Sequence, residues 1–143
     1  MAKETFVVAY DGQDRGVVDY ARVRAKASGA SLHIVHVLIW SPYSFLSAEE
    51  LEERRMRRRE ELERARIMLL DPLIAEITAE GIEVECEIRF GAPVDLILAV
   101  AQQQQATMIF VGRSGKRSIH NRIFGSVTLG LAQATKLPTV IVP

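Results

Sequence analysis

Met108-Ile109-Phe110-Val111 is an uninterrupted apolar stretch that ends at Gly112, and glycines and cations follow it. A short apolar run that contains β-branched residues and stops at a glycine is typical of a strand covered on both faces. Strands of this kind belong to parallel sheets, because the helical connections between parallel strands cover both faces. The stretch therefore predicts an α/β fold, and the sequence on either side of it agrees.

Five short apolar runs alternate with longer segments of helical periodicity. We expect strands at residues 5–10, 31–38, 82–90, 107–111 and 139–142. We expect helices at residues 14–28, 48–80, 93–104 and 125–135. This alternation predicts an open parallel sheet with helices on both faces. A chain of 143 residues suits one domain, spanning residues 1–143.

Two of these segments are less regular than the others. The run at residues 82–90 alternates apolar with charged side chains, so we expect it at the margin of the sheet with one face in water. Asp71-Pro72 lies inside the longest helical segment. Because Asp favours the N-cap and Pro the first position of a helix, we expect a kink or a break there, with a new helix after it.

Composition and charge exclude several classes of protein. Eighteen Lys and Arg balance 18 Asp and Glu, which argues against attraction of the whole surface to nucleic acid or an anionic membrane. The single cysteine, Cys86, excludes an intramolecular disulfide and a multi-cysteine zinc site. No apolar run approaches the roughly 20 residues that span a bilayer, and no signal peptide is visible. We expect a cytoplasmic protein without membrane insertion and without a nucleic-acid partner.

The run Arg54-Arg55-Met56-Arg57-Arg58-Arg59 has two interpretations. It could be a basic patch for nucleic acid. However, Glu50 and Arg54, Glu53 and Arg57, and Glu60 and Arg64 stand four residues apart, the spacing at which opposite charges support a helix. We therefore favour a solvated, charged helix face.

The segment after the fourth expected strand carries the candidate ligand site. Gly112 and Gly115 follow the strand, and Gly125-Ser126 is expected to open the last helix. Glycines let backbone N–H groups approach a ligand, and the first N–H groups of a helix bind anions. Between Gly112 and Val127 there are several cations and no carboxylate, which suits a polyphosphate. Turn glycines, a capping serine and solvated cations would give the same pattern.

Ligands of open parallel sheets bind beyond the carboxyl ends of the strands, where successive connections diverge. Asp11 ends the first strand, so it is either a ligand contact or a turn residue before Gly12. His33 and His36 fall on opposite faces of one strand, so we do not expect a metal site from them. Cys86 is expected to be a buried apolar residue rather than a reactive thiol.

The spacing of the glycines resembles the nucleotide-binding branch of the universal stress protein (UspA) family. Gly112, two residues, Gly115, nine residues and Gly125-Ser126 match its G-x2-G-x9-G-[S/T] signature. The similarity extends along the whole chain, to Asp11-Gly12, Val35-His36-Val37, Gly91-Ala92-Pro93 and Leu137-Pro138-Thr139-Val140-Ile141-Val142.

This resemblance implies a Rossmann-like five-stranded sheet in the order 3-2-1-4-5, with a nucleotide between the first and fourth strands. The implied ligand is ATP, or ADP or AMP, with Mg or Mn bridging the phosphates. In that arrangement Asp11 would lie near the base and ribose, the backbone of Val37 near the adenine edge, and Gly125 with its neighbours at the phosphates. The full implied set is Ala9, Tyr10, Asp11, Val37, Gly112, Arg113, Gly115, Gly125, Ser126 and Val127.

The resemblance also implies a cytoplasmic stress-response protein that regulates through its nucleotide-bound state and forms a homodimer through Thr139–Val142. Two alternatives remain open: a dimeric scaffold for a protein partner with an empty site, and a weak ATP hydrolase. The sequence contains neither a P-loop nor a kinase catalytic motif, and the glycine loop offers no obvious base. We therefore expect hydrolysis to be slow at most, and we assign no catalytic residue.

Overall fold

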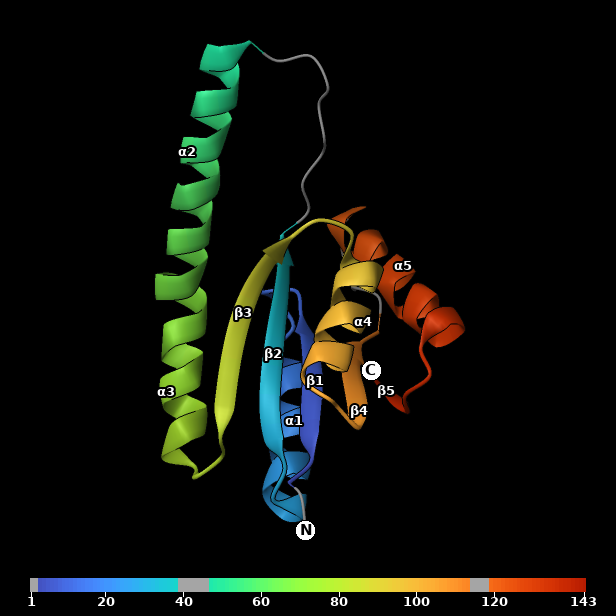
Figure 1. Cartoon of the computed structure of the whole chain (residues 1–143). Coiled ribbons are helices and arrows are strands. Elements are labelled where there is room, and N and C mark those ends of the chain that lie inside the picture. The colour runs from blue at the N-terminus through green and yellow to red at the C-terminus, as the bar shows by residue number, and fades with distance from the viewer. Residues whose placement is uncertain (1–2, 39–46, 114–118) are drawn as a thin grey trace.

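The computed structural model describes residues 3–38, 47–113 and 119–143. In chain order the elements are β1 (Thr5–Tyr10), α1 (Arg15–Ser28), β2 (Ser31–Leu38), α2 (Ala48–Ala65), a π-helical turn (Arg66–Leu70), α3 (Asp71–Ala79), β3 (Val84–Phe90), α4 (Pro93–Gln103), β4 (Met108–Gly112), α5 (Ile119–Ala134) and β5 (Thr139–Val142). Figure 1 shows the sheet at the centre, with the long α2–α3 rod beside β3. Within the described part of the chain, no helix has the length and apolar character needed to span a membrane.

The five strands form one sheet in the order β3-β2-β1-β4-β5, and every neighbouring pair is parallel. This confirms the α/β fold with a parallel sheet and the strand order that the resemblance implied. In the central pair, Val8 of β1 lies opposite Phe110 of β4. The run at residues 82–90 forms the edge strand β3, as its alternating pattern predicted, although the strand itself starts at Val84.

Two apolar layers cover the two faces of the sheet, because alternate residues of each strand point to opposite sides. On one face, α1 and α3 pack against a cluster around Phe110 that includes Val18 and Ile77. On the other face, α4 and α5 pack against a cluster that includes Val100 and Leu131. Helices therefore cover both faces, which explains the continuous apolar character of β1 and β4.

The long helical segment is not interrupted as expected. Asp71 does not cap a new helix, because the N-cap position is Leu70, which is itself helical and makes no side-chain capping bond. The irregularity is the π-helical turn before it, in which the Asp71 N–H bonds to the Arg66 carbonyl. Pro72 has no N–H, and its ring would press on a carbonyl of the preceding turn. A wider turn accommodates the proline without ending the rod.

A small polar network lies between β2 and the edge strand β3. The buried His33 contacts the Glu87 carboxylate through Nε2, and Arg89 Nε donates to the other Glu87 oxygen at 2.5 Å. Arg89 also donates to Gln103 of α4 at 3.3 Å. Partial burial by itself would raise the pKa of Glu87, but the bonds from His33 and Arg89 outweigh it and hold that pKa below its ordinary 4.5.

Replacing Glu87 with Gln should therefore destabilise the protein in a pH-dependent manner. A carboxyl group whose pKa is lowered by folding stabilises the fold above pH 4.5, and this contribution disappears as the pH falls through the lowered value. We expect Glu87→Gln to cost about 1 kcal/mol of unfolding free energy at pH 7 and progressively less in acid, measured by urea denaturation.

Glu85→Gln is the matched control for this prediction. Glu85 Oε2 lies 3.6 Å from His33 Nδ1, but its side chain is 78% exposed, against 22% for Glu87. Its replacement should change the free energy of unfolding by less than about 0.5 kcal/mol, both at pH 7 and in acid. An equal loss for the two variants, or a loss for Glu87→Gln that persists in acid, would contradict the assignment.

Candidate functional site

The carboxyl ends of β1 and β4 lie side by side at one edge of the sheet. Ala9 pairs with Val111, so Asp11 and Gly112 follow at the same level. The chain leaves β1 toward α1 on one face of the sheet and leaves β4 toward α5 on the other face. This divergence of connections is the place where open parallel sheets bind ligands.

The turn after β1 is organised by two carboxylates. Asp11 Oδ1 accepts hydrogen bonds from the N–H groups of Gln13 and Asp14, both at 2.8 Å. Asp14 then caps α1, because its Oδ1 accepts from the Gly16 N–H at 2.9 Å. Asp11 is thus a turn residue, as one of the two sequence interpretations held, and that turn sits at the edge where a ligand would bind.

A buried histidine lies beneath this turn. His36 Nδ1 is 2.9 Å from the Tyr10 carbonyl, and the residue is only 6% exposed. Gly12 has φ +92°, and a Cβ there would lie 3.0 Å from His36 Cε1. The glycine therefore serves two purposes, since it permits the left-handed backbone and leaves room for the imidazole.

Gly112 is enclosed by the two helices that leave the edge. A Cβ on Gly112 would lie 2.8 Å from Asp14 Oδ2, so only glycine lets the α1 cap approach the end of β4. Its carbonyl accepts a hydrogen bond from Thr128 Oγ1 of α5 at 2.8 Å. The next amide, of Arg113, donates to the Val142 carbonyl of β5 at 2.8 Å. Sequence analysis missed Asp14 and Thr128, although an Asp directly before a helix is a recognisable capping signal.

The last helix begins earlier than expected. α5 starts at Ile119, so Gly125 and Ser126 lie inside it and do not open it. No glycine or proline occurs between residues 119 and 124 to end a helix, and an internal glycine costs only about 1 kcal/mol. The expectation that Gly125 opens the helix is therefore wrong, and its amide lies beyond the first turn, where amides are normally bonded within the helix.

The remaining expected residues are placed as follows. Ala9 and Tyr10 are buried, 1% and 3% exposed, and Val127 is buried as well. Val37 is partly buried in β2, whereas Arg113 and Ser126 are exposed. Gly115 lies outside the described residues. The structure therefore brings Asp11 and Gly112 to one edge, with Val127 and Thr128 of α5 against the same region.

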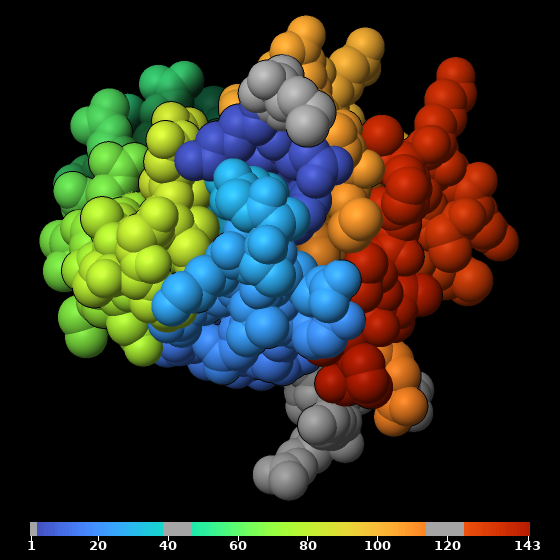
Figure 2. All heavy atoms as spheres, turned by 90° about the horizontal axis from the view of Figure 1, so that it is seen from below, coloured from blue at the N-terminus to red at the C-terminus, as the bar shows by residue number. Residues whose placement is uncertain are grey.

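Other described residues line hollows away from this edge. One, of about 620 Å³, lies at the opposite, amino end of the strands beside Thr5, Ser31 and His33. Figure 2 views the molecule from this end. No group of three or more His, Cys, Asp or Glu residues in the described ranges could hold a metal ion.

The strand order and the parallel sheet define a Rossmann-like α/β protein. The family model of the universal stress protein family matches residues 4–143. The chain therefore belongs to the universal stress protein family. No curated protein sequence matches it significantly.

Solved structures agree with this assignment. A universal stress protein in complex with cAMP is 29% identical, with a TM-score of 0.61, and the match covers 100% of this chain and 98% of that one. The universal stress protein from Archaeoglobus fulgidus in complex with dAMP is 22% identical, with a TM-score of 0.64 and full coverage of both chains. The hypothetical protein MJ0577 has a TM-score of 0.72 at 19% identity, covering 99% of this chain and 96% of its own.

Proposed function

We propose that this protein binds an adenine nucleotide at the carboxyl edge of β1 and β4. ATP is the first candidate. The observation that carries the proposal is the placement of Asp11 and Gly112 at the point where the connections diverge. The relative that is 29% identical was solved with cAMP, an adenine nucleotide. A bound state that differs in shape from the free state would then act as a cytoplasmic stress-response signal.

The phosphate end of this site requires a rearrangement of α5. For the amides of Gly125, Ser126 and Val127 to reach phosphates, residues 119–124 must leave the helix, so that Gly125 becomes its first turn. The new terminus would present unpaired N–H groups and the positive end of the helix dipole to the anion. Breaking a short helical segment in front of a glycine is inexpensive, because glycine already lowers helix stability by about 1 kcal/mol. Mg or Mn would accompany the nucleotide and neutralise part of its phosphate charge.

Calorimetric titration with Mg-ATP, ADP and AMP tests the proposal. We expect the wild-type protein to bind, and a Kd near ~1 μM would correspond to about 8 kcal/mol. Asp11→Asn keeps an oxygen for the Gln13 and Asp14 amides, so the turn should persist. It replaces a charged acceptor for the ribose or base with a weaker neutral one, so ATP affinity should fall roughly tenfold, about 1.4 kcal/mol.

Glu83→Gln is the matched control, because Glu83 is exposed at the amino end of the sheet, where it pairs with Lys3. That variant should bind ATP like wild type. Absence of heat with every nucleotide, together with an unchanged melting temperature, would contradict nucleotide binding. Equal affinity of Asp11→Asn and wild type would contradict the role of Asp11 alone.

A dimeric scaffold is the second candidate function, and the edge strand β5 favours it. β5 lies at the end of the sheet order, and Ile141 is 46% exposed on it. An uncovered apolar edge strand tends to pair with another strand, so we propose a homodimer through Thr139–Val142. A monomer in sedimentation equilibrium at tens of micromolar protein would contradict it. As for catalysis, we propose ATP hydrolysis far below the ~1 s⁻¹ of dedicated enzymes.

A further inference from the structure

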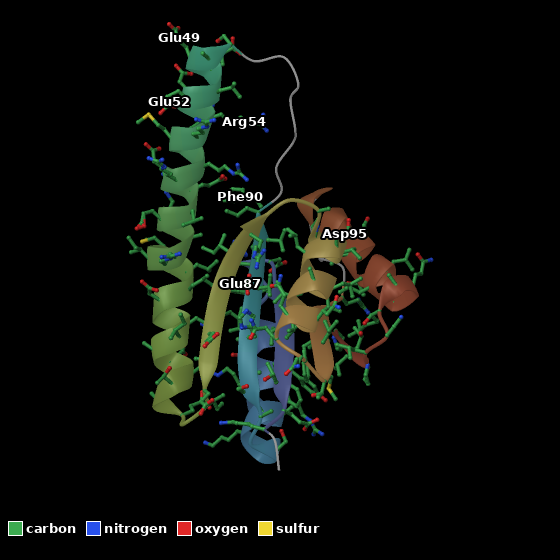
Figure 3. All side chains as sticks on the ribbon, viewed as in Figure 1. Glu49, Glu52, Arg54, Glu87, Phe90 and Asp95 are labelled. Atoms are coloured by element: carbon green, nitrogen blue, oxygen red, sulfur yellow. The ribbon has the colours of Figure 1, made fainter. Side chains whose placement is uncertain are left out.

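Helix α2 (Ala48–Ala65) has no buried residue. In Figure 1 its upper turns extend past the end of the sheet, with no other helix beside them. Figure 3 shows Glu49, Glu52 and Arg54 on these turns, above Phe90 at the end of β3. Isolated helices of this length are marginal in water, and helical stability in proteins comes mostly from packing. Among the residues that the structure describes, no packing of this kind supports the upper part of α2.

The charges of this exposed part are segregated along the chain. Glu49-Glu50-Leu51-Glu52-Glu53 is followed directly by Arg54-Arg55-Met56-Arg57-Arg58. The second group repeats the first with every Glu replaced by Arg and the apolar residue kept in the middle. Read in opposite directions, the two groups place a Glu against every Arg and Leu51 against Met56.

We propose that residues 49–58 form an antiparallel contact with the same residues of a second copy of this chain. The two-fold axis would pass between Glu53 and Arg54. Glu53 of each copy would then face Arg54 of the other, and Glu50 would face Arg57. These four residues are spaced i, i+3, i+4 and i+7, so they lie on one stripe of the helix. A two-fold contact requires such a self-complementary surface.

The stripe is accessible to a partner. Glu50, Glu53 and Arg57 are exposed, and Arg54 is partly buried. Leu51 and Met56 are 43% and 55% exposed, so they supply apolar surface on either side of the stripe. Within the helix, Arg55 lies 3.9 Å from Glu52.

Arg58, on another side of α2, packs against the edge strand of the sheet. Arg58 stacks over the Phe90 ring at 4.5 Å, beside a hollow of about 640 Å³ that Arg55, Arg59 and Leu62 also line. A nucleic acid would be attracted by the arginines but repelled by the four glutamates that precede them. A second copy satisfies both groups at once, which is why we favour it as the occupant.

Exposed ion pairs contribute only about 0.2–1 kcal/mol each, so the contact should be weak and sensitive to salt. Sedimentation velocity at 50 and 500 mM NaCl measures it, on the full chain at several concentrations. If β5 also pairs, the α2 contact appears as the further step from dimer to tetramer. We expect this step at low salt and its loss at high salt.

Charge reversal provides the decisive comparison. Glu50→Arg with Glu53→Arg makes the stripe wholly basic, and Arg54→Glu with Arg57→Glu makes it wholly acidic. Each double variant alone should lose the association step through like-charge repulsion. An equimolar mixture of the two should regain it, and so should the quadruple variant, whose charges are exchanged throughout. Circular dichroism of each variant confirms that the helix is retained.

The contact is overturned if the wild-type protein shows no salt-sensitive association step. It is also overturned if both double variants associate like wild type, or if their mixture fails to associate although both are folded. None of these outcomes depends on nucleotide, because the titrations are made without it.

Discussion

Phe110→Ala should lower the free energy of unfolding by about 3–5 kcal/mol, a large part of the 5–15 kcal/mol that typically stabilises a domain. Phe110 is 1% exposed in the interior strand β4, and its ring lies 5.3 Å from that of Phe6 and 6.1 Å from that of Tyr20. Truncation removes apolar contact area and leaves a cavity between the sheet and α1. Urea denaturation followed by circular dichroism measures the loss.

Leu129→Ala is the control for this loss, because Leu129 is 63% exposed on α5. Its free energy of unfolding should stay within about 0.5 kcal/mol of wild type. If Phe110→Ala costs less than about 1 kcal/mol, the ring is not part of a close-packed core and the described packing is wrong.

Gly12→Val should be the second most damaging of the substitutions discussed here, costing about 3 kcal/mol. A β-branched residue at φ +92° incurs backbone strain of about 1–3 kcal/mol. In addition, its Cβ would lie 3.0 Å from His36 Cε1 and 3.3 Å from Leu69 Cδ2. Displacing the imidazole would break the contact between His36 Nδ1 and the Tyr10 carbonyl, at the floor of the candidate site.

Gly29→Val separates the backbone strain from the steric crowding. Gly29 also has a positive φ, +76°, but a Cβ there would meet nothing within 4 Å. This variant should therefore show the backbone strain alone and lose about 1–2 kcal/mol less than Gly12→Val in the same urea experiment. Equal losses of unfolding free energy at the two glycines would show that the crowding around His36 does not contribute to the loss.

The sheet was predictable from sequence because its strands satisfy two independent requirements. Met108-Ile109-Phe110-Val111 is apolar throughout, which only burial on both faces explains, and the alternation at residues 82–90 indicates an edge. Both expectations were confirmed, because they depend on the solvent exposure of each face and not on details of packing. The strand order came from the family resemblance, since local patterns do not determine which strands pair.

The errors fall where the sequence permits two local structures of similar free energy. Asp71-Pro72 fits a helix start, but a π-helical turn accommodates the proline as well. Gly125-Ser126 fits a helix N-terminus, yet the preceding residues continue the helix equally well. The contacts of Asp14 and Thr128 with Gly112 depend on tertiary packing, so no sequence pattern predicted them.

We propose that an adenine nucleotide binds at the carboxyl edge of β1 and β4. Amide hydrogen exchange with and without Mg-ATP tests this claim and its location together. On binding of Mg-ATP we expect slower exchange at residues 9–13, at Gly112 and at residues 125–127, with faster exchange at residues 119–124. Unchanged exchange at this edge under saturating Mg-ATP, or protection confined to the amino-end hollow beside Thr5 and Ser31, would contradict it.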